Sequence, residues 1–370
     1  MTVPITAAAP DAPTAQGPSA ADGSAEGPSA PQVLARCREL VRPALAAAVD
    51  LLHPWPAEMA AFSLGWCEVG GCPGPGGGGE GKGVRQALTV LCAEAAGAPA
   101  ESAVAGAVAV ELIHTFTLLH DDIMDGDETR RQRPTVWKAY GTGPAVLAGD
   151  ALFALALETL ATAENAHSAA AIRRLTQALR HLVHGQAEDL LFESRPWTGP
   201  GAVRLDEYRS MADHKTGALL GCAAALGAQL AGAPSSTVAA LAQTGRHLGV
   251  AFQTVDDLLG VWGDPEVTGK PVHSDLRRGK KTFPVLAALS SSTPAARRLG
   301  ELLASPSPLD DAALRDAAAL IEEAGGRAAA LDEARRHLDL ATRSLHSVPL
   351  DPAAVGDILA LLPFLVSRRM

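Results

Sequence analysis

The chain is poor in aromatic residues and lacks the patterns that mark β-sheets, nucleotide-binding loops and cysteine-ligated zinc. Aromatic residues make up 4% of its 370 residues, and few segments alternate apolar and polar side chains. No GxGxxG or Walker loop follows a strand-like run. The five cysteines are odd in number and lack paired CxxC spacing, so they predict free thiols in a reducing compartment.

Basic stripes and membrane-crossing runs are also lacking. The formal net charge is −10, which argues against nucleic acid as a partner. The chain does not open with a basic segment followed by an apolar run, as a signal peptide would. The most apolar later run, 216–234, is short and interrupted by Gln229 and several glycines. We therefore expect a cytoplasmic protein with no integral membrane segment.

The chain does have long stretches of apolar residues at helical spacing, and 47% of its residues are hydrophobic. This pattern predicts an all-α fold. Residues 1–31 hold six prolines and almost no large apolar side chains, so they are predicted to be a disordered tail. Residues 32–370 are predicted to form a single helical domain, with breaks at 97–99, 132–134, near 165, at 196–201, 306–308 and 325–326.

The most informative run is 121–131, which holds five acids and two arginines directly after the apolar stretch 111–119. Asp121 and Asp125 are four residues apart, so they share one face of a helix with Cβ atoms about 6 Å apart. Carboxylates that close repel one another unless a cation lies between them, and hard oxygen ligands suit Mg²⁺. The arginines suit diphosphate oxygens. The run predicts a magnesium–diphosphate site; a solvated helix end with surface ion pairs is the alternative.

A second apolar helix, 248–255, also ends in adjacent aspartates, Asp256 and Asp257. Two such helix ends that face each other across a bundle would form a metal-binding mouth above an apolar cavity.

The order of these motifs resembles that of the trans-isoprenyl diphosphate synthases of the polyprenyl synthetase family, from about Gly81 to Pro284. Residues 121–125 fit the family's DDxxD, and 111–114 and 130–135 fit its flanking segments. The resemblance implies an isoprenoid-synthase-type helical bundle around a central apolar cavity, with two Asp-rich helix ends at its mouth. It also implies a homodimer.

The resemblance implies about three Mg²⁺ ions in the site. Their ligands would be Asp121, Asp125, Asp189, Asp256 and Asp257, with Asp122 in support. Asp189 belongs to 184–190, which resembles the family's GQxxDL. The second acidic motif departs from the family pattern because Gly260 stands where its last acid is usual. This departure puts in doubt the water shell of the third metal.

The resemblance also implies two diphosphate sites. Residues 81–85 are similar to the family's GKxxR segment, although Gln86 stands where a proline is usual. The residues implied for isopentenyl diphosphate are Lys82, Arg85, His114 and Arg131. Those implied for the allylic substrate are Arg130, Gln186, Lys215, Lys270 and Lys280, with Thr216 and Gln253 stabilising the developing cation. Without the resemblance these would be loop charges, a core histidine and helix-surface groups.

The implied reaction is a head-to-tail (1′-4) condensation of isopentenyl diphosphate with allylic diphosphates. Phe116 lies five residues before Asp121, about 7.5 Å along the helix axis, and Thr117 follows it. In the family, an aromatic followed by a small residue implies a C20 product, so we predict geranylgeranyl diphosphate, with farnesyl diphosphate next.

Two alternatives remain at this point. A class I terpene cyclase also uses DDxxD, but the stretch after Asp257 lacks the serine of its second metal motif. A non-catalytic subunit of a heteromeric synthase typically loses an acidic motif. Gly260 keeps that second alternative open.

Overall fold

The computed structural model describes residues 28–72, 81–265, 271–305 and 307–366. Most of the predicted disordered tail, the glycine-rich segment 73–80 and Lys270 lie outside these residues. The first helix begins at Ala30. The predicted all-α fold is confirmed, since 75% of the structure is helical.

The helices and strands follow one another in this order: α1 (Ala30–Val49), α2 (Pro54–Ser63), α3 (Val84–Ala95), η1 (Ala100–Ala103), α4 (Val104–Asp125), β1 (Thr129–Arg130), β2 (Arg133–Pro134), α5 (Val136–Tyr140), α6 (Thr142–Thr162), α7 (Ser168–Glu193), α8 (Leu205–Ala212), η2 (Asp213–Gly217), α9 (Ala218–Leu230), α10 (Ser235–Trp262), α12 (Ser274–Arg277), α13 (Phe283–Leu289), α14 (Pro294–Leu303), α15 (Asp311–Glu323), α16 (Gly326–Leu345) and α17 (Pro352–Val366).

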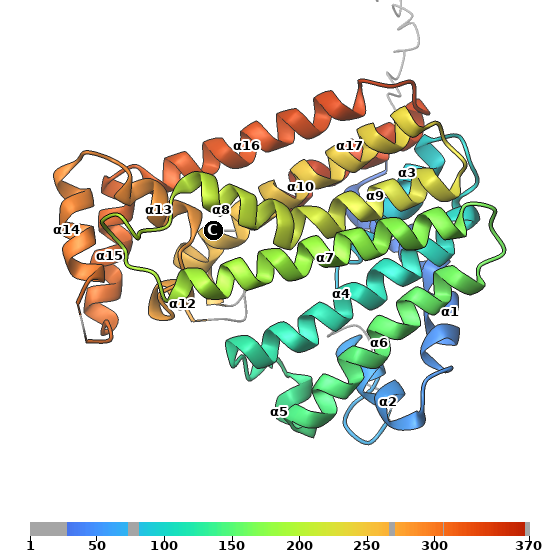
Figure 1. Ribbon diagram of the computed structural model, residues 1–370, viewed down its shortest axis with the longest axis horizontal. Helices are drawn as coiled ribbons and strands as arrows, with labels where there is room; N and C mark the ends of the chain where they lie inside the picture. The colour runs from blue at the N-terminus through green and yellow to red at the C-terminus, as the bar shows by residue number, and fades with distance from the viewer. Residues whose placement is uncertain (1–27, 73–80, 266–270, 306, 367–370) are drawn as a thin grey trace, which may run out of the picture.

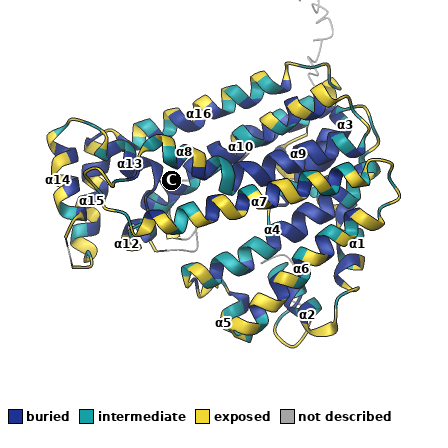
Figure 2. Ribbon diagram, viewed as in Figure 1, coloured by how far each residue is buried: buried dark blue, intermediate teal, exposed yellow. Residues whose placement is uncertain are grey.

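The bundle is organised around α9, which packs against α3, α4, α7 and α10 (Figure 1). All of its residues except Gln229 are buried, as Figure 2 shows. A helix that is apolar on every side must be covered on every side. Its small residues allow close approach: a Cβ atom at Gly227 would lie 2.1 Å from the carbonyl oxygen of Thr89 on α3. The helices α13, α14 and α15 share a second apolar cluster at one end of the bundle.

Two helical stretches, Ala100–Asp125 and Thr142–Thr162, are long and apolar enough to cross a membrane by length and composition alone. The run noted above as the most apolar, 216–234, is a different one. The most apolar windows of these stretches are 67% and 39% buried inside the bundle, respectively. Since α4 and α6 pack against each other, burial accounts for most of the apolar α4 window and for part of the α6 window, and the described residues contain no clear membrane span.

Two local features near the predicted motifs were not expected from helical spacing. The predicted helix 205–230 contains a π-helical turn, η2, between α8 and α9. The break at 132–134 is a small antiparallel hairpin in which Thr129 pairs with Pro134. Its turn residues Arg131 and Gln132 have φ angles of 51° and 62°, as a type I′ turn requires. A non-glycine residue rarely adopts this conformation, so the hairpin fixes the direction of Arg131 at some cost in strain.

Candidate active site

Acids from α4 and α7 meet two lysines from distant parts of the chain. Lys280 donates to Asp125 at 2.9 Å and its Nζ lies 4.0 Å from Asp189. Lys215 of η2 donates to Asp189 at 2.5 Å. Burial alone would lower the pKa of Lys280, but Asp189 and Asp125 hold it above its ordinary value. The first acidic motif, the GQxxDL segment and both lysines therefore converge, as the resemblance implied.

Asp121 lies in the same cluster, one helical turn before Asp125. Burial raises its pKa to about 6; Lys215 counteracts the rise and Asp125 adds to it. A carboxylate that is desolvated beside another carboxylate favours an additional cation. The donors here are carboxylate oxygens, which fit Mg²⁺. Asp121, Asp125 and Asp189 are the residues that would hold it, and the resemblance implies Asp256 of α10 as a further ligand.

Asp122 and Asp257 face protein donors instead. Arg130 donates to Asp122 through Nε at 2.9 Å and Nη2 at 2.6 Å. Asp257 accepts hydrogen bonds from the Tyr208 hydroxyl, from the Phe283 amide at 2.8 Å and from Gln253 at 3.1 Å. Both carboxylates are buried. In this structure they orient their neighbours, and a direct role of either in metal binding stays a prediction.

The turn η2 is held between two helices at glycines. A Cβ atom at Gly185 of α7 would lie 2.3 Å from the Lys215 amide nitrogen, and one at Gly249 of α10 would lie 2.5 Å from the Gly217 Cα atom. The missing side chains let the backbone of η2 sit directly against both helices. This packing places Lys215 beside Asp189.

The same packing places Thr216 beside α10. Its hydroxyl donates to the Gln253 oxygen at 2.7 Å, and Gln253 in turn donates to Asp257. Gln186, one residue after Gly185, is buried, and its Nε2 has no hydrogen-bond partner among the described residues.

A second, basic cluster lies around the start of α3. Arg85 contacts His114 at 3.1 Å between Nη1 and Nε2. The Arg131 guanidinium lies over Gly81, with Nη2 2.9 Å from the position a Cβ atom would take. Arg38 of α1 donates to the Gly81 carbonyl oxygen at 3.1 Å. Several cations that converge on one segment favour an anionic ligand.

His114 is neutral in this cluster. Burial lowers its pKa well below the ordinary value, and Arg85, Arg131 and Arg130 lower it further. The predicted residues Arg85, His114 and Arg131 thus come together, and Lys82 lies beside them in sequence. Arg38 was missed, because an arginine on an amphipathic helix carries no motif.

The second acidic motif is completed in space by a different residue. A Cβ atom at Gly260 would lie 1.9 Å from Asp275 Oδ2 and 2.4 Å from its Cγ. The carboxylate of Asp275 therefore occupies the position in which a side chain at 260 would begin. This carboxylate comes from the segment that leads to Lys280, so an acid lies beside position 260 although α10 itself has none there.

The sequence model of the polyprenyl synthetase family matches residues 78–321, about two thirds of the chain. The chain belongs to the polyprenyl synthetase family. It is 46% identical over 340 residues to the (2E,6E)-farnesyl diphosphate synthase of Mycobacterium tuberculosis, covering 91% of this chain and 93% of that protein. It is 42% identical over 338 residues to the geranylgeranyl diphosphate synthase of the same organism, with the same coverage.

Solved structures of the family agree in fold. The polyprenyl synthetase from Streptomyces coelicolor A3(2) superposes with a TM-score of 0.83 at 47% identity, covering 90% of this chain and 98% of that one. A polyprenyl synthase from Caulobacter crescentus, solved with calcium and isoprenyl diphosphate, gives 0.78 at 29% identity, covering 92% and 99%. This polyprenyl synthetase is therefore a prenyltransferase, a short-chain trans-prenyl diphosphate synthase that acts on isoprenoid diphosphates.

Further contacts hold the loop around Lys280 in place, and the sequence motifs did not indicate them. Arg278 forms an ion pair with the buried Asp127, just after α4. Lys281 lies over the Trp197 ring, 3.9 Å from its centroid, and donates to the Glu193 carbonyl oxygen. These contacts join the segment that carries Lys280 to the residues that follow α4 and to the end of α7. No local pattern indicates them, because each joins residues far apart in sequence.

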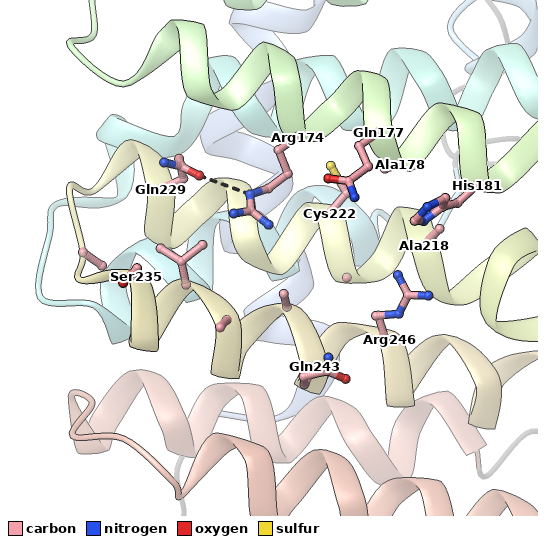
Figure 3. Close-up of a pocket in the computed structure, with 15 residues that line it drawn as sticks. Arg174, Gln177, Ala178, His181, Ala218, Cys222, Gln229, Ser235, Gln243 and Arg246 are labelled. Carbon is pink, nitrogen blue, oxygen red and sulfur yellow. Dashed lines mark hydrogen bonds between the residues drawn. The ribbon is translucent and has the colours of Figure 1, made fainter.

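A pocket of about 400 Å³ lies apart from this site, between α7, α9 and α10 (Figure 3). Arg174, His181 and Arg246 line it, and none of its lining residues belongs to the predicted site. Arg246 forms an ion pair with Asp213 of η2, and Arg174 donates to Gln229.

Proposed function

We propose that this synthase condenses isopentenyl diphosphate head-to-tail (1′-4) with an allylic diphosphate, with about three Mg²⁺ ions, and that geranylgeranyl diphosphate is its main product. The observation that supports the reaction is the presence of two separate charged clusters, one suited to metal ions and the other to an anion. One is the acid–lysine cluster of Asp121, Asp125 and Asp189. The other is the basic cluster around Arg85, His114 and Arg131.

In this mechanism the lysines exchange partners. Lys215 and Lys280 now neutralise Asp189 and Asp125. If these carboxylates held a metal ion, both lysines would become available to donate to the oxygens of the allylic diphosphate. Bound Mg²⁺ would stabilise negative charge on the departing diphosphate. Arg130, held by Asp122, lies at the same end of α4, and Lys270 is proposed as a further contact.

The basic cluster would hold isopentenyl diphosphate. Arg85, Arg131 and Lys82 bind its diphosphate, and neutral His114 donates or accepts one hydrogen bond. The Thr216 and Gln253 oxygens would stabilise the allylic cation as the bond from C1 to oxygen breaks. The double bond of isopentenyl diphosphate then attacks C1, and the departing diphosphate takes the proton that the new cation loses.

Phe116 and Thr117 are proposed to set product length. The Phe116 ring lies 4.7 Å from the His120 ring and 5.6 Å from the Phe153 ring of α6, between centroids. We predict geranylgeranyl diphosphate because an aromatic residue at 116 is followed by a small residue at 117, the pattern that implies a C20 product in the family. Farnesyl diphosphate is the second candidate, because the relative that is 46% identical makes it by name.

Shortening Phe116 to alanine is expected to lengthen the product by one or more isoprene units, because the ring no longer blocks the cavity. Products of wild type, Phe116→Ala and Phe153→Ala are separated by chain length after incubation with labelled isopentenyl diphosphate. Trp55→Ala, an exposed aromatic on α2, serves as the control. If Phe116→Ala gives a product of unchanged length, Phe116 does not limit the length of the product.

The reaction itself is tested with labelled isopentenyl diphosphate, Mg²⁺ and dimethylallyl, geranyl or farnesyl diphosphate. We expect elongation that EDTA abolishes. Release of a hydrocarbon would support a terpene cyclase instead. No elongation with any allylic partner would support a non-catalytic subunit and contradict the proposal.

We also propose that the synthase is a cytoplasmic homodimer. Apolar side chains are exposed along α6 and α7, namely Val146, Leu147, Val183 and Leu191. A second copy that covered them would bury this surface. Sedimentation equilibrium measures the oligomeric state, and a monomer at micromolar concentration would contradict the proposal.

A further inference from the structure

Two histidines and a glutamate gather on the neighbouring surface of α7 and η2. His184 Nε2 lies 3.4 Å from Glu188 Oε1, and His214 Nδ1 lies 3.6 Å from Glu188 Oε2. One ligand atom of each residue lies within 4.8 Å of the others. The His214 ring also lies 4.9 Å from the His184 ring and 5.4 Å from the His181 ring.

These distances suit a small divalent ion. Tetrahedral zinc with bonds of about 2.0–2.1 Å has neighbouring ligand atoms about 3.3 Å apart. The two nitrogen–oxygen separations, one to each Glu188 oxygen, are close to this value. Imidazole nitrogens select zinc and similar transition metals, whereas Mg²⁺ prefers oxygen. The chemistry therefore differs from that of the aspartate site.

Two of the ligand atoms face each other without a hydrogen bond. Glu188 Oε2 and His214 Nδ1 are buried, and neither has a hydrogen-bond partner within the residues that the structure describes. Buried polar atoms normally have a hydrogen-bond partner or a bound ion, so these two atoms favour a bound cation between them. The side chain of His184 is 60% exposed, which gives an ion a path from solvent.

The backbone holds the ligands in place. Gly185 follows His184 directly, and a Cβ atom there would lie 2.8 Å from the His214 Cβ. This close contact fixes His214 against the turn of α7 that carries His184 and Glu188. The site is thus built on helical elements, which position ligands more firmly than loops do.

We propose that His184, Glu188 and His214 bind one zinc-class divalent ion, with the fourth position open to water. The ion would join α7 to η2, next to Asp189 and Lys215 in sequence. This site is separate from the proposed function and does not depend on it.

The test uses the full chain with Cys72→Ser, since Cys72 is the exposed thiol among the described residues. Excess Mg²⁺ occupies the aspartate site. Zinc binding is measured by calorimetry, and Co²⁺ binding by visible absorption, which is intense only for a tetrahedral ion. The variants are His184→Ala, Glu188→Gln and, as a matched control, His346→Ala, which removes an exposed histidine from the end of α16.

We expect one equivalent of zinc and a tetrahedral Co²⁺ spectrum in wild type and in His346→Ala. Affinity should fall by about tenfold or more in His184→Ala and Glu188→Gln. His184→Ala alters an exposed side chain, so its fold should be retained. The proposal is overturned if wild type binds no zinc in excess Mg²⁺, or if His184→Ala binds it as tightly as wild type does.

Discussion

Replacing Asp121 with alanine is expected to lower kcat/KM by about 10³-fold, because it would remove a proposed metal ligand at the place where charge develops on the leaving group. Asp121 is desolvated beside Asp125, and its raised pKa reflects that environment. The measurement is the rate of isopentenyl transfer as a function of Mg²⁺ concentration. The Mg²⁺ concentration for half-maximal rate should also rise.

Asp122→Asn is the matched comparison. This neighbouring acid accepts hydrogen bonds from Arg130 and does not share the helix face that carries Asp121 and Asp125. We expect its main effect on the KM of the allylic substrate, with little change in Mg²⁺ dependence. Equal changes in Mg²⁺ dependence for both variants would contradict the different roles assigned to the two carboxylates.

Restoring the usual acid at position 260 is expected to harm the enzyme. A Cβ atom there would lie 1.9 Å from Asp275 Oδ2, so Asp275 must leave its position. Such overpacking costs about 1–3 kcal/mol in the free energy of unfolding. Gly260→Asp should cost more than Gly260→Ala, because two carboxylates then share one space. Urea unfolding measures the free energy of unfolding of both variants. The rate of the synthase reaction should also fall, because Asp275 is displaced.

Gly356→Ala provides the control, because Gly356 is also helical but a Cβ atom there would have no neighbour within 4 Å. Glycine in an exposed helix is less favourable than alanine by about 1 kcal/mol, so this variant should be more stable than wild type. We therefore expect the free energy of unfolding to fall in the Gly260 variants and to rise in Gly356→Ala. If Gly260→Asp is as stable and active as wild type, Asp275 does not replace the missing acid.

Several local features follow from sequence patterns, and the structure confirms them. Helix α4 ends within the acidic run, at Asp125, and the second acidic helix is present as α10, although it continues to Trp262 and does not end at its aspartates. Helical periodicity, capping and glycine positions are properties of neighbouring residues, so they can be read along the chain. The resemblance also brought together Asp125, Asp189, Lys215 and Lys280, which the structure places in contact.

Other features depend on residues that meet only when the chain is folded. The π-helical turn η2 forms where Gly185 and Gly249 accept its backbone. Tyr208 binds Asp257 from 49 residues away, and Arg38 reaches Gly81 across 43. None of these partners is marked by spacing, because the contact is set by how the helices pack.

The sequence by itself determined the all-helical class, the end of the first acidic helix and the family, since these rest on local spacing and on the order of motifs. Only the tertiary structure decided that α10 continues past its aspartates, which carboxylates face Lys215 and Lys280, that Asp275 occupies the space left by Gly260, and that His214 lies beside His184 and Glu188. Those outcomes depend on distances of a few ångströms between helices that are remote in sequence. Close packing of the bundle fixes those distances.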